Sequence, residues 1–117
     1  AKIRFAFKAE ACRTVVFTAN GEKGHVFRFV ASAAGTSIRA FPPGDEHKSV
    51  ELAKGPSLKL GEWVGVAVEL NGSKAVVSVG KDFTQTVESP HLAAAKANIS
   101  VGFSFGTLSV RDVVIEQ

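Results

Sequence analysis

Apolar and polar residues alternate with a period of two along most of this chain, and no other feature constrains its fold as strongly. Segment 2–8 has the order Lys-Ile-Arg-Phe-Ala-Phe-Lys, which places Ile3, Phe5 and Phe7 on one face. Successive side chains of a β-strand point to opposite sides, so this segment is predicted to be an antiparallel strand with one buried face. Further strands are predicted at 14–19, 25–31, 36–41, 49–53, 64–70, 75–79, 83–87, 98–105 and 108–116.

Two local signals sharpen this pattern. Asn71-Gly72 separates two alternating runs, and Asn-Gly in that place predicts a β-hairpin with a type I′ turn, whose two central residues both need positive φ. Strict alternation is lost around Arg111-Asp112, which predicts a β-bulge in the last strand.

Helical signals are confined to one short stretch. Ser89 suits an N-cap, Pro90 suits the first helical position, and alanines follow. At most one short helical turn is therefore expected near 90–96. About nine or ten short strands with regular turn signals are typical of a sandwich. The sequence predicts a single all-β domain over 1–117, an antiparallel two-sheet sandwich of the jelly-roll type.

Composition and charge exclude several classes of function. The chain has nine Phe, one Trp and no Tyr, so its aromatic residues indicate a core more than a binding surface. The net charge of +3 comes from scattered basic residues, whereas nucleic-acid binding needs a clustered basic face, and no nucleic-acid partner is expected. No apolar stretch is long enough to span a membrane. Cys12 is the only cysteine, so no intrachain disulfide can form.

No catalytic or metal-binding pattern is present. His25, His47 and His91 lie far apart in the sequence, so no metal site or cofactor is expected. The acidic residues do not form the spaced pair that glycoside hydrolysis uses, and no Gly-x-Ser-x-Gly nucleophile motif occurs. No catalytic residue can be named, and the sequence favours a protein that is not an enzyme.

What remains is recognition by the face of a sheet. Trp63 lies on the opposite face of its strand from Val64, on the same side as Glu69, and Arg28 and Arg39 likewise oppose apolar neighbours. An indole ring can stack on a sugar while charged groups bind its hydroxyls. These residues, together with His25, are the predicted contacts for a carbohydrate. The alternative, in which Trp63 belongs to a second apolar core, stays open at this point.

The chain also resembles a known family. Four segments resemble segments of concanavalin-A-like, or laminin-G-like, jelly rolls. They are Gly24-His25-Val26-Phe27-Arg28, Leu60-Gly61-Glu62-Trp63, the hairpin at 66–80 and the closing strand at 102–115. The nearest group is 3-keto-disaccharide hydrolase-like and is placed with family 16 glycoside hydrolases. Val64 stands where many relatives have His or Asn, and the Glu-x-Asp-x-x-Glu strand of family 16 is absent. The first strands of these relatives are missing too.

The resemblance implies a protein that acts on or binds carbohydrate and is secreted or located in the cell envelope. The leading hypothesis is a non-catalytic, lectin-like module that binds carbohydrate on one sheet face through Trp63, Arg28, Arg39, Glu69 and His25. One alternative is a structural domain that pairs with a second copy or another chain through an exposed strand edge. The other is a part of a glycan-processing hydrolase of the 3-keto-disaccharide type.

Overall fold

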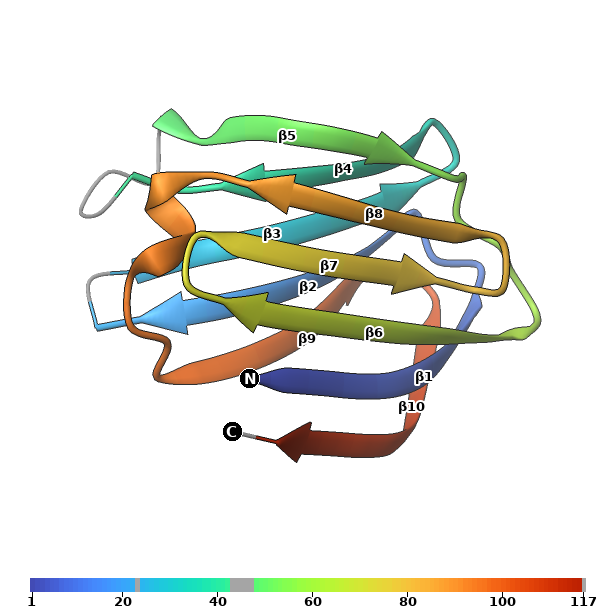
Figure 1. Ribbon diagram of the computed structural model, residues 1–117. Coiled ribbons are helices and arrows are strands. Elements are labelled where there is room, and N and C mark those ends of the chain that lie inside the picture. The colour runs from blue at the N-terminus through green and yellow to red at the C-terminus, as the bar shows by residue number, and fades with distance from the viewer. Residues whose placement is uncertain (23, 43–47, 117) are drawn as a thin grey trace.

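The computed structural model describes residues 1–22, 24–42 and 48–116, and it contains two five-stranded antiparallel sheets that pack face to face (Figure 1). Sheet A has the order β10-β1-β6-β7-β8, and sheet B has the order β5-β4-β3-β2-β9. The strands are β1 (Lys2–Glu10), β2 (Thr14–Gly21), β3 (Gly24–Ser32), β4 (Gly35–Ala40), β5 (Val50–Gly55), β6 (Trp63–Asn71), β7 (Lys74–Val79), β8 (Phe83–Glu88), β9 (Asn98–Ser104) and β10 (Thr107–Glu116). The predicted all-β antiparallel sandwich is confirmed.

The 3₁₀ helix η2 (Pro90–Ala93) connects β8 to β9, where a short helical turn was expected. Ser89 caps it, because the Ser89 hydroxyl accepts a hydrogen bond from the backbone N–H of His91 at 3.3 Å. No helix in the described ranges is long and apolar enough to cross a membrane.

The predicted hairpin is confirmed, but the predicted turn type is wrong. Asn71 pairs with Lys74, so the turn residues are Gly72 and Ser73 and not Asn71 and Gly72. Gly72 has φ +59, while Ser73 is not among the residues with positive φ. A glycine with positive φ in the first central position is typical of a type II′ turn, which matches the twist of the strands equally well.

The predicted bulge lies in β10. Arg4 pairs with Val114 and Ala6 pairs with Arg111, so two residues of β10 oppose one residue of β1. Asp112 accommodates the extra residue with φ +57. The loss of alternation at Arg111-Asp112 is thus confirmed as a bulge.

Phenylalanine rings from both sheets form the centre of the core. Phe17 on β2 is fully buried. Its ring stacks on Phe5 at a centroid distance of 5.7 Å and on Phe29 at 5.6 Å, and meets Phe27 edge-on at 6.2 Å. Phe5 belongs to sheet A and the other three rings to sheet B. This cluster joins the two sheets and places four of the nine phenylalanines at the centre of the core.

The two sheets separate along the side formed by β9 and β10. Both are edge strands, and apolar side chains there remain open to solvent: Phe103 is 49% exposed and Ile115 is 52% exposed. The chain begins on β1 and ends on β10, its antiparallel neighbour (Figure 1).

Candidate functional site

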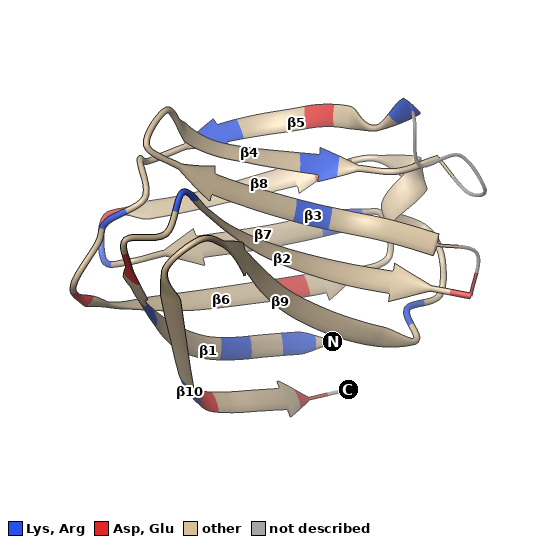
Figure 2. Ribbon diagram, turned by 180° about the vertical axis from the view of Figure 1, so that it is seen from behind, with Lys and Arg blue, Asp and Glu red and all other residues tan. Residues whose placement is uncertain are grey.

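The outer face of sheet B carries a group of polar side chains. Phe17, Phe29 and Ile38 point into the core, so their neighbours Thr18, Arg28 and Arg39 point outward. These three outward residues stand side by side, since Thr18 pairs with Arg28 across β2 and β3, and Arg28 pairs with Arg39 across β3 and β4. Figure 2 views this face and shows basic bands on the adjacent strands β3 and β4.

Arg28 and His25 form the centre of this group. The Nε of Arg28 donates to the hydroxyl of Thr18 at 3.1 Å, and its Nη2 lies 2.8 Å from Nε2 of His25. A guanidinium can only donate, so Nε2 of His25 accepts and its Nδ1 carries the proton. That Nδ1 then donates to Oδ1 of Asn20 at 2.6 Å. The guanidinium of Arg28 also lies over the ring of Phe41, 5.6 Å from its centroid.

The chain of hydrogen bonds continues onto β9. The amide of Asn20 donates to Oδ1 of Asn98 at 2.9 Å. A directed series therefore runs from Arg28 through His25 and Asn20 to Asn98, across three neighbouring strands. Side chains linked in this way lose rotational freedom before any ligand arrives, which lowers the entropic cost of binding.

Arg39 has its own set of partners on its own strand β4, on β5 and at Ser49 just before β5. Its Nη1 donates to Glu51 at 3.3 Å and to the Ser37 hydroxyl at 3.3 Å. Its Nε donates to the hydroxyl of Ser49 at 2.9 Å and its Nη2 to the Ser49 carbonyl at 3.2 Å. The carboxylate of Glu51 places an acceptor beside Arg39 on this face.

The structure divides the five predicted contacts between two faces. Arg28, Arg39 and His25 lie together on sheet B, whereas Trp63 and Glu69 lie on β6 and point outward from sheet A. Trp63 is 38% exposed. The alternative that Trp63 belongs to a second apolar core is therefore wrong.

Arg111 covers the exposed ring of Trp63. Its guanidinium carbon lies 3.9 Å from the ring centroid, which is a cation–π contact. Trp63 thus has a partner on the same outer face of sheet A, where Trp63 pairs with Lys8 of β1 and Arg111 pairs with Ala6 of β1.

Sequence reasoning did not find Thr18, Asn20, Glu51 and Asn98. A period-two count from Phe17 places Thr18 outward, so that residue could have been found. Asn20 meets His25 only because the register of β2 and β3 shifts between Ala19 and Asn20. No residue type in the sequence marks this shift.

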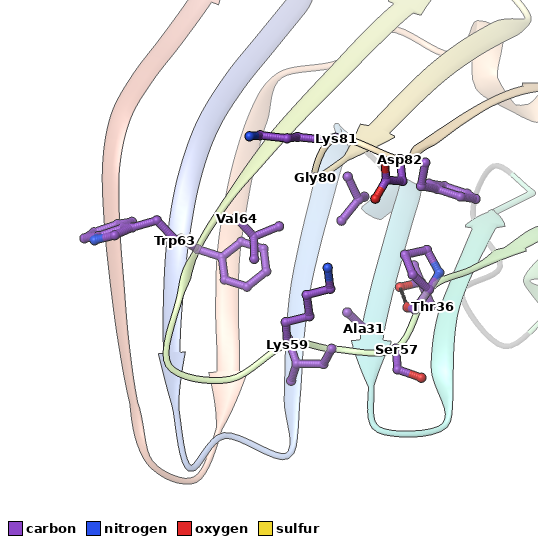
Figure 3. Close-up of a pocket in the computed structure, with 14 residues that line it drawn as sticks. Ala31, Thr36, Ser57, Lys59, Trp63, Val64, Gly80, Lys81 and Asp82 are labelled. Atoms are coloured by element: carbon purple, nitrogen blue, oxygen red, sulfur yellow. Dashed lines mark hydrogen bonds between the residues drawn. The ribbon is translucent and has the colours of Figure 1, made fainter.

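A separate cavity of about 240 Å³ opens at one end of the sandwich, between the two sheets. Its apolar lining includes Phe7, Val64 and Phe83, and Lys59 and Asp82 lie in its lining as well (Figure 3). In Figure 3 the ring of Trp63 extends away from the other lining side chains. The cavity does not include the arginines of sheet B.

Within the described ranges, no group of three or more His, Cys, Asp or Glu residues could hold a metal ion. His47, one of the three histidines whose spacing predicts no metal site, lies outside the described residues.

Comparison with known proteins adds the fold class. The sequence matches no family model and no curated protein. Among solved structures, carbohydrate-binding module CBM66 from Bacillus subtilis matches with a TM-score of 0.71 and 7% identity, over 96% of this chain and 71% of that one. Chicken galectin 2 matches with a TM-score of 0.68 and 13% identity, over 94% and 88% of the two chains.

A third match is CG-16, a homodimeric agglutinin from chicken liver, with a TM-score of 0.73 and 11% identity over 97% of this chain and 88% of that chain. The fold is a concanavalin-A-like jelly roll. The predicted resemblance to such jelly rolls is therefore confirmed at the level of the fold. Identities this low carry the fold alone, and the function of the jelly roll has to be argued from its own surface.

Proposed function

We propose that this jelly roll is a non-catalytic, lectin-like module that binds carbohydrate through the outer face of sheet B. The observation that carries the proposal is the hydrogen-bonded series of Arg28, His25 and Asn20, with Arg39 on the next strand. Sugars present hydroxyl groups that both donate and accept, and a fixed array of donors and acceptors on one surface can match them.

The chemistry of the individual side chains suits this role. Arg28 has more N–H donors than its two hydrogen bonds to Thr18 and His25 use. Glu51 supplies a carboxylate acceptor on the same face, held by Arg39. The similar structures that are named as a carbohydrate-binding module and an agglutinin support the proposal. Secretion or attachment to the cell envelope, which the sequence resemblance implies, is part of it.

Truncation of Arg28 tests the proposal. We expect Arg28→Ala to weaken glycan binding by at least about tenfold, because hydrogen bonds from a charged group contribute about 1.5–3 kcal/mol each. Binding should first be sought on a glycan array at high protein concentration, and the affinity then measured by NMR titration. Single modules bind with dissociation constants of about a micromolar to a millimolar, so the titration needs millimolar ligand.

Arg4→Ala is the matched control, because Arg4 is an exposed arginine on sheet A that pairs with Glu116. It should leave binding unchanged. Trp63→Ala forms the third arm. If Trp63→Ala abolishes binding and Arg28→Ala does not, the glycan binds to sheet A and the assignment to sheet B is wrong. If the wild-type protein binds no glycan, the proposed function itself is wrong.

Assembly through a strand edge is the second candidate function, and the open side of the sandwich favours it. Val113 is 53% exposed and Val114 is 41% exposed on β10, in addition to Ile115 and to Phe103 on β9. An edge strand with exposed apolar side chains is a template for pairing with another chain. We propose a second copy of this chain as the partner, since the similar CG-16 is named as a homodimeric agglutinin.

We expect reversible self-association that depends on protein concentration, measured by sedimentation velocity. Ile115→Lys should abolish it, because a charge would have to be buried in the interface. Leu60→Lys is the control, since Leu60 is 53% exposed but lies in the loop before β6. A monomer at every concentration would contradict this candidate. The hydrolase alternative stays a prediction.

A further inference from the structure

Arg28 is a half-buried guanidinium whose partners in the described part of the chain are all uncharged. These partners are the Thr18 hydroxyl, the His25 imidazole and the ring of Phe41. Taking a charge partly out of water is costly unless an opposite charge compensates it. The described residues place no carboxylate against Arg28.

The other arginines in the described ranges do not share this situation. Arg4, Arg39 and Arg111 each pair with a carboxylate, at 3.3, 3.3 and 3.5 Å respectively. Arg13 is exposed and lies over the ring of Phe105. Arg28 therefore combines partial burial with the lack of an anionic partner among the described residues.

The position of Arg28 is also fixed in advance. Thr18 and His25 hold two sides of its guanidinium, and Asn20 in turn holds His25. A planar guanidinium can bind a carboxylate or a sulfate group through two parallel N–H···O bonds, and a fixed orientation reduces the cost of forming them.

The surrounding charge on this face favours an anion. Each of the strands β3, β4 and β5 carries one outward basic residue, respectively Arg28, Arg39 and Lys54. Among the described residues of these three strands, Glu51 is the acidic one. Arg39 is already paired with Glu51, so the positive charge that remains is centred on Arg28 and Lys54. Figure 2 shows these basic bands on neighbouring strands.

We propose that the saccharide bound by sheet B is acidic and that its carboxylate or sulfate group binds to Arg28. The inference rests on the proposed carbohydrate-binding function and names the class of sugar. A uronic acid carries a planar carboxylate and a sulfated sugar carries a tetrahedral sulfate, and both groups are oxyanions attached to a hydroxylated sugar ring. The experiment separates these two classes of sugar.

Matched pairs of oligosaccharides test the proposal by isothermal titration calorimetry. The first pair is oligogalacturonate and its fully methyl-esterified neutral form, and the second is κ-carrageenan oligosaccharide and its desulfated neutral form. We expect at least about tenfold tighter binding of the acidic member in one pair. The salt concentration should be about 0.15 M, at which exposed charges beyond about 8 Å are largely screened.

Two variants assign the effect to Arg28. Arg28→Gln should remove the preference for the acidic member. Arg28→Lys should also reduce it, because an ammonium keeps the charge but lacks the two-pronged geometry. Arg4→Gln removes the same charge from sheet A and should leave the preference intact. If Arg4→Gln reduces the preference as much as Arg28→Gln does, the binding is general electrostatic attraction and the inference is wrong.

The remaining outcomes separate this inference from the proposed function. If the protein binds the neutral members as tightly as the acidic members and Arg28→Gln abolishes both, carbohydrate binding on sheet B stands and the acidic class is wrong. If it binds no member of either pair but binds another neutral glycan through Arg28, carbohydrate binding on sheet B again stands and the acidic class is again wrong. If it binds no glycan of any kind, both proposals fail.

Discussion

Phe17→Ala is expected to unfold a large part of the protein population, or at least to lower its melting temperature by more than about 10 °C. The ring of Phe17 is fully buried and contacts Phe5, Phe27 and Phe29. Removal of a buried Phe side chain costs about 3–5 kcal/mol, through lost burial and the cavity that it leaves. Natural domains are stable by only about 5–15 kcal/mol.

Thermal and urea denaturation followed by circular dichroism measure this loss. Phe103→Ala is the matched control, because Phe103 is also a phenylalanine on a strand of sheet B but is 49% exposed. It should cost less than about 1 kcal/mol, as most surface substitutions do. Equal losses for the two variants would show that the rings between the sheets do not dominate the stability of the sandwich.

The strands could be predicted because burial follows the same period as the sequence. Ile3, Phe5 and Phe7 are each less than 5% exposed, as their alternation with Arg4 and Ala6 indicates. The bulge at Asp112 was visible for the same reason, since an extra residue interrupts the period. The residue pattern of a single strand therefore shows which of its side chains point into the core and which point to solvent, without any knowledge of the neighbouring strands.

The composition of the site could not be predicted, because alternation does not say to which sheet a strand belongs. Trp63 and Arg28 both oppose apolar neighbours, and both point outward as predicted. They point outward from different sheets, since β6 joins sheet A and β3 joins sheet B. Sheet membership is decided by pairings between segments that are far apart in the chain, such as β1 with β6.

The hydrogen-bonded series around Arg28 depends on register, which is equally hidden. Asn20 lies opposite His25 because of a one-residue shift at the end of β2, and its link to Asn98 comes from a strand 78 residues away. The sequence predicted Arg28 and Arg39 as contacts from residue type and face, and His25 from residue type, since period two places His25 on the side of Phe27. It could not identify Asn20 or Asn98, because neither residue has a local pattern that sets it apart from a turn residue.

Gly106→Ala is expected to be as damaging as the loss of a core ring, for a reason that involves only the backbone. Gly106 lies in the turn between β9 and β10 with φ +66, a conformation that residues other than glycine adopt at a cost. A Cβ atom on Gly106 would lie 2.6 Å from the carbonyl carbon of Ala11, and closer still to the carbonyl oxygen of Glu10. Neither backbone group can rotate away as a side chain could.

We expect Gly106→Ala to destabilise the protein by more than about 3 kcal/mol, since strain at a positive φ alone costs about 1–3 kcal/mol and the overlap adds to it. Gly72→Ala separates the two causes, because Gly72 has φ +59 and nothing lies within 4 Å of a Cβ placed there. It should show the conformational cost alone. Denaturation midpoints and hydrogen exchange of the β10 amides measure the difference.

If the two alanine variants lose the same stability, the 105–107 turn relaxes freely, and the packing of Gly106 against Ala11 does not hold β10 at the edge of sheet A. If Gly106→Ala loses more and exposes the β10 amides to exchange, this contact is what fixes the edge strand, and with it the apolar surface proposed for self-association.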